Sequence, residues 1–466
     1  MENHLLDKKI AYLTLGCKVN GYETEAIKAY FKGMGAVEVP FREHADIYLI
    51  NTCTVTNIAD RKSRQMLHRA RKENPNALLV ATGCYVQEFF RNHEEDNLAD
   101  LCVGNRRKSE IATLVNEYLD CLMSGGTPER FFVNDDNSLI HYENMVAVSE
   151  ENHCRAYMKI QDGCNQFCSY CIIPFARGRI SSRSEEEIMK EASLLAESGY
   201  REVVITGIHL SSYGLEGLSL REQQKLLPDT GESPLLTILR KLSAVPQFER
   251  IRLGSLEPRI MTEAFVKGLS GIPKICPHFH LSLQSGCDRT LKAMNRKYTT
   301  EEFASAVRLL RKYFSNPALT TDIIVGFPGE TEADFEESMA FAEKIGFAQI
   351  HIFPYSRRKG TVADRMKEQH TEAVKHNREV VFSELEHRLR EDYCRQFIGI
   401  PQQILVEEAV CKDGVLYGKG HNERYCSFVF PVNPEAVGAT VTVIGENITT
   451  DCTIDAKTVD IFHKIE

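Results

Sequence analysis

Three closely spaced cysteines are the residues of this chain best suited to chemistry. Cys164, Cys168 and Cys171 form a C-x-x-x-C-x-x-C run, with no fourth cysteine and no histidine close by. A structural zinc site normally closes with four ligands, and most protein-held Fe–S cubanes use four thiolates. Three thiolates on a short loop can hold a cubane by three irons and leave the fourth iron open to a small molecule. The alternative is a zinc loop, or three unrelated thiols.

This run resembles the cysteine motif of the radical S-adenosylmethionine (SAM) superfamily. In that superfamily the amino and carboxylate groups of SAM bind the open iron. The cluster then gives one electron to the sulfonium, the S–C5′ bond breaks, and a 5′-deoxyadenosyl radical forms. Tyr170, directly before the last cysteine, stands where the superfamily usually has an aromatic residue near the nucleoside. The resemblance implies a [4Fe–4S] cluster on these three cysteines, with SAM as cofactor.

Length and composition limit the possible classes of protein. The 466 residues allow about two to four domains. No apolar run is long enough to span a bilayer, and the N-terminus lacks a signal peptide's apolar core, so we expect a cytoplasmic protein with no membrane partner. Fifteen cysteines in such a chain favour metal or redox chemistry over disulfides. With a net charge of −9, any RNA site must be a local basic patch.

Three further cysteines follow three apolar runs in the first third of the chain. Cys17, Cys53 and Cys84 come at the ends of the runs 9–15, 46–52 and 77–83. Continuous apolar runs separated by helical patterns predict a parallel sheet in an α/β domain. Because the carboxyl ends of parallel strands share one edge, the three thiols should converge there.

A second cubane with one open iron is therefore our interpretation of Cys17, Cys53 and Cys84. The alternative for each is a core cysteine, since free cysteine is often buried. Cys102, near the end of another strand-like segment, is a possible fourth ligand, but we expect it to be structural.

A polar stretch at 121–152, with one short strand expected at 145–148, separates this block from a second strand–helix alternation. Six strands are expected there, at 155–160, 202–206, 250–253, 278–283, 320–325 and 348–353. A full TIM barrel needs eight such units. Six predict a partial (β/α)6 barrel, open on one side to a macromolecular substrate, with its active residues at the carboxyl ends of the strands.

Polar and small residues at these strand ends are candidate SAM contacts. They are Gly207, Ser255, Gln284 and Phe353, together with Tyr170. Gly207 would let the backbone approach SAM closely. The alternative role for Gln284 is to cap the next helix. For Asp322, a polar residue within the fifth strand, the alternative to a SAM contact is a pairing inside the barrel.

The last block follows a long amphipathic helix expected at 371–396. Five short strands are expected at 403–407, 415–418, 426–432, 440–444 and 451–453, which predicts a small OB-like β-barrel. Residues 397–466 hold five Lys/Arg and ten Asp/Glu, so a purely electrostatic hold on RNA is excluded there. A local contact through Arg424 remains open.

Basic clusters elsewhere are candidate phosphate contacts. The candidate RNA-binding residues are Arg61, Arg64, Arg69, Arg177, Arg179 and Arg424. The alternative is a solvated helix face.

The whole order of these parts resembles the radical SAM methylthiotransferases, and within them the MtaB branch. The isopentenyladenosine branch usually has Gln-Met-Asn after the first cysteine, where this chain has Lys18, Val19 and Asn20. The motifs are TLGCKVN at 14–20, NTCTVT at 51–56, KSR at 62–64, KIQDGC at 159–164, LQSG at 283–286 and TDIIVGFPGE at 321–330. The resemblance implies an N-terminal domain at 1–145, a radical SAM domain at 146–396 and a TRAM domain at 397–466.

The resemblance also implies the reaction. One SAM would methylate a sulfur presented by the cluster at Cys17, Cys53 and Cys84, and a second SAM would supply the radical. The C2 hydrogen of N6-threonylcarbamoyladenosine beside the tRNA anticodon would be replaced by a methylthio group. The partners would be the tRNA anticodon stem-loop, a reductant such as flavodoxin or ferredoxin, and a sulfur donor. The alternatives are isopentenyladenosine tRNA, a ribosomal-protein aspartate, or a non-catalytic metal-binding protein that binds RNA.

Overall fold

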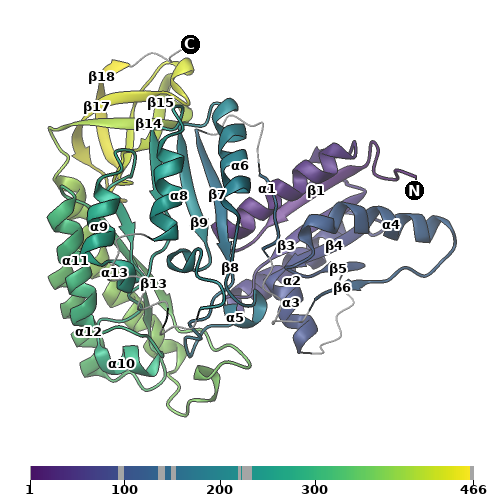
Figure 1. The fold of residues 1–466 in the computed structure, drawn as a ribbon, viewed down its shortest axis with the longest axis horizontal. Helices are drawn as coiled ribbons and strands as arrows, with labels where there is room; N and C mark the ends of the chain where they lie inside the picture. Colours follow the sequence, from purple (N-terminus) through teal and green to yellow (C-terminus); the bar gives the residue numbers. More distant parts are fainter. Residues whose placement is uncertain are drawn as a thin grey trace.

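The computed structural model describes residues 2–92, 99–134, 142–147, 154–218, 222 and 233–461. Figure 1 shows an α/β domain beside a central barrel of strands and helices, with a small all-β barrel at one end of it. Among the described residues, none of the helices has both the length and the apolar character that a membrane span requires.

The first domain is built on a parallel six-stranded sheet of order β2-β1-β3-β4-β5-β6. All residues of its central strands β3 and β4 are buried, which explains their continuous apolar character. The strands are β1 (Lys9–Thr14), β2 (Val37–Val39), β3 (Ile47–Thr52), β4 (Leu78–Gly83), β5 (Leu101–Val103) and β6 (Phe131–Phe132). Helices α1 (Lys18–Gly33) and α4 (Ile111–Met123) cover one face, and α2 (Asn57–Glu73) and α3 (Cys84–Arg91) cover the other.

The segment expected as a polar linker is partly structured. Helix α4 extends into it and β6 adds an edge strand to the sheet. The prediction of a strand at 145–148 is wrong for residues 145–147, and residue 148 lies outside the described residues, as do 135–137. Met145 and Ala147 instead pack in the apolar core of the first domain.

The central domain is a partial barrel of six parallel strands, as predicted. Two sheets, β10-β9-β7-β8 and β11-β12-β13, are joined by single bridges such as Leu256–Leu281. The six strands are β7 (Arg155–Asp162), β9 (Glu202–Gly207), β10 (Arg250–Leu253), β11 (His278–His280), β12 (Ala318–Val325) and β13 (Gln349–Pro354), and the short β8 (Ser181–Ser182) pairs antiparallel with β7. The helices are α5 (Ile173–Ala176), α6 (Glu185–Glu197), α8 (Pro234–Ser243), α9 (Glu263–Ser270), α10 (Asp288–Ala293), α11 (Thr300–Tyr313), α12 (Glu332–Ile345) and α13 (Glu372–Arg395).

The interior face of this barrel is polar. On β7, Met158 and Ile160 belong to the core between the strands and the outer helices, so the alternate residues Tyr157 and Lys159 face the interior. The same alternation places polar side chains inside from all six strands. They include Arg155, Glu202, Arg252, His280, Asp322 and His351. A complete TIM barrel fills this space mainly with branched apolar residues.

The C-terminal domain is a closed barrel of order β14-β15-β16-β18-β17, which agrees with the predicted OB-like fold. Its strands are β14 (Pro401–Lys412), β15 (Val415–His421), β16 (Ser427–Pro431), β17 (Thr440–Ile448) and β18 (Ile454–Ile461). The last strand was predicted wrongly at 451–453. Those residues form a turn in which the Thr453 amide donates to Thr449 Oγ1 (3.1 Å) and to Asp451 Oδ1 (3.3 Å).

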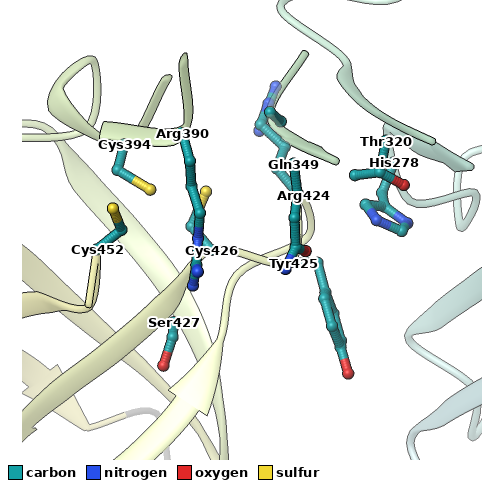
Figure 2. A pocket seen from close by; sticks show the side chains of 11 residues that line it. His278, Thr320, Gln349, Arg390, Cys394, Arg424, Tyr425, Cys426, Ser427 and Cys452 are labelled. Carbon is teal, nitrogen blue, oxygen red and sulfur yellow. The ribbon is translucent and has the colours of Figure 1, made fainter. Parts of the chain in front are cut away.

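This C-terminal barrel covers the amino ends of the central strands. Arg155, which begins β7, donates to Glu407 at 2.6 Å, and Arg250, which begins β10, donates to the His421 carbonyl at 3.0 Å. Figure 2 shows Arg424 and Tyr425 of the small barrel near His278 of β11. The three-cysteine loop follows the last residue of β7, so it lies at the opposite end of the central barrel.

Candidate active site

Two of the three N-terminal cysteines are placed by the same backbone device. Gly16 (φ 100°) precedes Cys17, the N-cap of α1, and Gly83 (φ 102°) precedes Cys84, the first residue of α3. A Cβ at Gly83 would lie 2.4 Å from the Thr52 carbonyl oxygen, so only glycine fits. Each thiol therefore lies at a helix N-terminus, where the peptide dipoles favour the negative charge of a metal-bound thiolate.

Cys53 completes this set, as the sheet topology predicted. Its amide donates to Ser63 Oγ (3.3 Å), and Ser63 Oγ donates back to the Cys53 carbonyl (3.1 Å), which fixes the turn into α2. Burial, with smaller contributions from the nearby Cys84 and Cys17, raises the pKa of Cys53 to about 11. The three thiols therefore lie close together. Cys102 instead packs in the apolar cluster under α2 and α3.

The second set of cysteines lies in the loop after β7. A Cβ at Gly163 (φ 69°) would lie 1.9 Å from the Arg179 carbonyl oxygen, so the turn into Cys164 requires glycine. The Ser169 amide donates to the Met294 carbonyl at 2.9 Å, which anchors the other end of the loop. Burial, with a smaller contribution from Cys168, raises the pKa of Cys171 to about 12.

Arg296 is a site residue that the sequence did not point to. Its Nη1 donates to Cys168 Sγ at 3.1 Å and its Nη2 donates to the Ser282 carbonyl at 3.2 Å. A guanidinium against a cysteine sulfur suits a thiolate bound to a cluster. In the sequence Arg296 is a single arginine shortly after α10, and no motif marks it as a site residue.

The spacing of both cysteine sets favours clusters over single zinc ions. Four thiolates around one zinc, each about 2.3 Å away, would lie about 3.8 Å from one another. Among the described residues, groups of three metal-ligand atoms all within 4.8 Å of one another occur twice, and neither group contains these six cysteines. In each set the three thiols gather at one place without all lying within 4.8 Å of one another, which fits a cubane with one open iron.

The five candidate SAM contacts all lie at carboxyl ends of the central strands. Ser255 and Phe353 are exposed, whereas Tyr170 is partly buried against an apolar cluster. A Cβ at Gly207 would lie 2.9 Å from the Gln161 side chain, so packing alone explains that glycine. The backbone N–H of Gln284 (φ 74°) donates to the Asp322 carbonyl. Gln284 does not cap α10, whose N-cap is Cys287.

A buried network of charges joins the two cysteine sets. We call it the Glu23 network, and it comprises Glu23, Lys108, Lys159, Asp162 and Arg177. Glu23, on α1, pairs with Lys159 and Arg177, each at 2.8 Å, and with Lys108. Although burial opposes it, these cations hold the pKa of Glu23 well below its usual range. The network fixes the helix that begins at Cys17 against the strand that leads to Cys164.

The prediction that Arg177 binds RNA is therefore wrong. Its side chain is 1% exposed and is bound to Glu23 and to Asp162. Arg424 is also engaged within the protein, since its Nε donates to the Asn316 carbonyl and its Nη2 to the Ser315 carbonyl, each at 2.8 Å.

The other candidate RNA contacts stay accessible. Arg61 and Arg64 are exposed on α2, Arg69 is half-buried beside them, and Arg179 is exposed next to the Phe167 ring. A hollow on α2 is lined by Arg61, Arg64, Gln65, Met66, His68, Arg69 and Lys72. Helix α2 begins shortly after Cys53, so this basic face borders the first cysteine set. Arg358, after β13, pairs with Asp60 at 2.7 Å and attaches α2 to the central barrel.

Comparisons with known proteins agree with this site. Residues 158–342 match the radical SAM superfamily, and residues 9–104 match Uncharacterized protein family UPF0004. The chain is 37% identical to threonylcarbamoyladenosine tRNA methylthiotransferase MtaB of Bacillus subtilis, over 93% of each chain. It is 32% identical to tRNA-2-methylthio-N(6)-dimethylallyladenosine synthase of Clostridium novyi, over 91% of each.

The chain belongs to the radical SAM methylthiotransferases. A SAM cofactor and a [4Fe–4S] cluster come with this family. A solved structure of the radical SAM methyltransferase TsrM from Kitasatospora setae shares the fold at a TM-score of 0.51 and 14% identity, with coverage of 88% of this chain and 79% of that one.

Proposed function

We propose that this methylthiotransferase converts N6-threonylcarbamoyladenosine in tRNA, next to the anticodon, into its 2-methylthio derivative. The observation that carries the proposal is the pair of three-cysteine sets, each of which would leave one iron of a cubane open, joined through the Glu23 network. The MtaB relatives, 34–37% identical, support the threonylcarbamoyl substrate.

In this proposal the chain holds two [4Fe–4S] clusters. Cys164, Cys168 and Cys171 bind the one that works with SAM, and Cys17, Cys53 and Cys84 bind the second. Together with SAM, these groups supply the one-electron chemistry that removes an aromatic C2 hydrogen and the sulfur that replaces it. The protein's part is to orient the two sets, exclude water and hold the base between them. Tyr170, Gly207, Ser255, Gln284 and Phe353 are proposed to surround SAM.

The three predicted domains divide the remaining tasks. The segment 1–145, which the packing of Met145 and Ala147 extends by a few residues, carries the second cluster. The segment 146–396 cleaves SAM. The segment 397–466 is TRAM-like. Phosphates of the anticodon stem-loop would contact Arg61, Arg64, Arg69 and Arg179, and a reductant such as flavodoxin or ferredoxin and a sulfur donor would complete the reaction in the cytoplasm.

The first test is mass analysis of tRNA nucleosides from a host that lacks its own enzyme, with and without this chain. The 2-methylthio threonylcarbamoyl nucleoside is the expected product. The isopentenyl product would move the chain to its sister branch, and an unchanged nucleoside profile with loaded clusters would favour a ribosomal-protein substrate.

Two variants separate the proposed roles of the cysteine sets. Cys168→Ser should abolish both SAM cleavage and product. Cys53→Ser should keep SAM cleavage and lose the methylthio product. If Cys168→Ser leaves SAM cleavage unchanged, or if the protein holds zinc and no labile sulfide, a non-catalytic metal-binding RNA-binding protein becomes the better description.

A further inference from the structure

Lys18 directly follows Cys17 in sequence and faces the interior of the central barrel. Its Nζ lies 5.6 Å from the centre of the Tyr157 ring, and Tyr157 is on the interior side of β7. One helical turn further, Glu23 contacts Lys159 on the same side of β7. Helix α1 therefore runs along the interior side of this strand, and its first residue, Lys18, lies against the Tyr157 ring.

The Lys18 ammonium has no carboxylate partner in the described part of the chain, where the Tyr157 ring is its close contact. The residue is accessible to solvent. Arg155, Arg252 and Glu202 are the charges that act on it, and Glu202 is already bound to both guanidinium groups at 2.8 Å. Two carboxylates, Glu202 and Glu407, thus serve the guanidinium groups of Arg155, Arg250 and Arg252 and leave the lysine unmatched. The surroundings of Lys18 are positive and would stabilise an entering anion.

We propose that Lys18 binds the free carboxylate of the threonylcarbamoyl group and so selects the substrate of this enzyme. The inference rests on the proposed function. Adenine C2 and N6 flank N1 on one edge of the base, so a base that presents C2 to the second cluster extends its N6 substituent along the same edge. The residue after a ligand of that cluster is well placed to meet it. The dimethylallyl group that the sister enzymes' name specifies has no charge for a lysine to bind.

Other polar groups on the same interior face suit the rest of the threonyl group. His280 Nε2 lies 3.3 Å from Asp322 Oδ2, and the His280 and His351 rings stack with their centres 6.0 Å apart. Lys18 acts electrostatically on His351, so these groups share one region. Imidazole and carboxylate groups offer hydrogen bonds to a hydroxyl and to a carbamoyl N–H. The N6 substituent would thus meet a cation at its carboxylate and imidazole and carboxylate groups beside it.

The test compares three anticodon stem-loops on the reconstituted enzyme with both clusters loaded. One carries N6-threonylcarbamoyladenosine, one carries the same group with its carboxylate converted to the amide, and one carries unmodified adenosine. A charge-assisted contact should make the wild type prefer the acid to the amide by about tenfold to a hundredfold in Kd. Lys18→Met should bind acid and amide equally, and Lys18→Arg should keep part of the preference.

Lys62→Gln is the matched control, because Lys62 is an exposed lysine on the basic helix α2. This variant should raise the Kd of all three RNAs by the same factor. If Lys18→Met also weakens all three equally, Lys18 contacts a phosphate and the proposal fails. It fails as well if Lys18→Met keeps the wild-type ratio of Kd between amide and acid. It also fails if the wild type itself binds acid and amide with the same Kd. Failure of the proposed function would show differently, as absence of methylthio product from the wild type.

Discussion

Glu23→Gln is the substitution that best tests how the two cysteine sets are held together. The Glu23 network contains three cations and two carboxylates, all but Asp162 almost fully buried. Glutamine keeps the shape of the side chain and removes one of the two negative charges. Three buried cations would then share Asp162 alone. Removing one partner of a buried ion pair typically costs about 3–5 kcal/mol.

That loss of unfolding free energy can be measured as a shift in melting temperature. For a domain of this size, 1 kcal/mol moves the midpoint by about 2–4 °C, so Glu23→Gln should lower the melting of the first domain by about 6–20 °C. The matched control is Glu25→Gln, two residues along α1, where the carboxylate is 40% exposed and pairs with Lys28 at 3.1 Å. Such a surface pair contributes less than about 1 kcal/mol.

The pH dependence supplies a second measurement. The pKa of Glu23 is held well below its usual range, chiefly by Arg177 and Lys108 acting against burial. Its stabilisation is therefore present above the unfolded-state pKa of about 4.3 and is lost as pH falls through the lower folded-state value. The gap between wild type and Glu23→Gln should be constant near pH 7 and should narrow below about pH 4. If Glu23→Gln melts like Glu25→Gln at pH 7, the network does not hold the domains together.

Three further predictions concern the site, the RNA and acid stability. Arg296→Met removes the donor to Cys168, so the cluster potential should become more negative and SAM cleavage should fall about 10–100-fold; an unchanged potential in an EPR titration would contradict this. Arg61→Gln should reduce the slope of log K for RNA binding against log salt concentration by about one. Arg424→Gln should leave that slope unchanged. The reverse pattern would show that RNA binds at the C-terminal barrel instead of at α2. Against the effect of burial, Arg252 and Arg155 lower the pKa of Glu202 to about 2, so denaturant titrations should show stability falling between about pH 4 and pH 2 in the wild type and less in Glu202→Gln.

The sequence was sufficient wherever local pattern and parallel topology decide the outcome. Cys17, Cys53 and Cys84 could be brought together because each ends a buried strand and parallel strands share an edge. The six central strands were found for the same reason. The strand Ile454–Ile461 was missed although its residues alternate, because the polar residues just before it were assigned to the strand instead of to a turn.

Contacts between domains could not be predicted in this way. Arg177 lies in a run of arginines that is typical of a phosphate site, yet its partner Glu23 is 154 residues away in sequence. Nothing in the local pattern shows that a helix of the first domain runs along β7 and buries that arginine. The contact of Arg424 with the Asn316 carbonyl was equally beyond the local pattern, since only the docked C-terminal barrel brings the two together.

The repeated glycine–cysteine turns have a consequence for the life of the enzyme. Cys17 and Cys84 are set by backbone that is already fixed by the sheet and by two helices, and Gly83 packs directly on the Thr52 backbone. If the proposed second cluster were destroyed by oxygen, this scaffold would keep the thiols gathered at one edge. New iron and sulfide could then be inserted without unfolding or replacing the polypeptide.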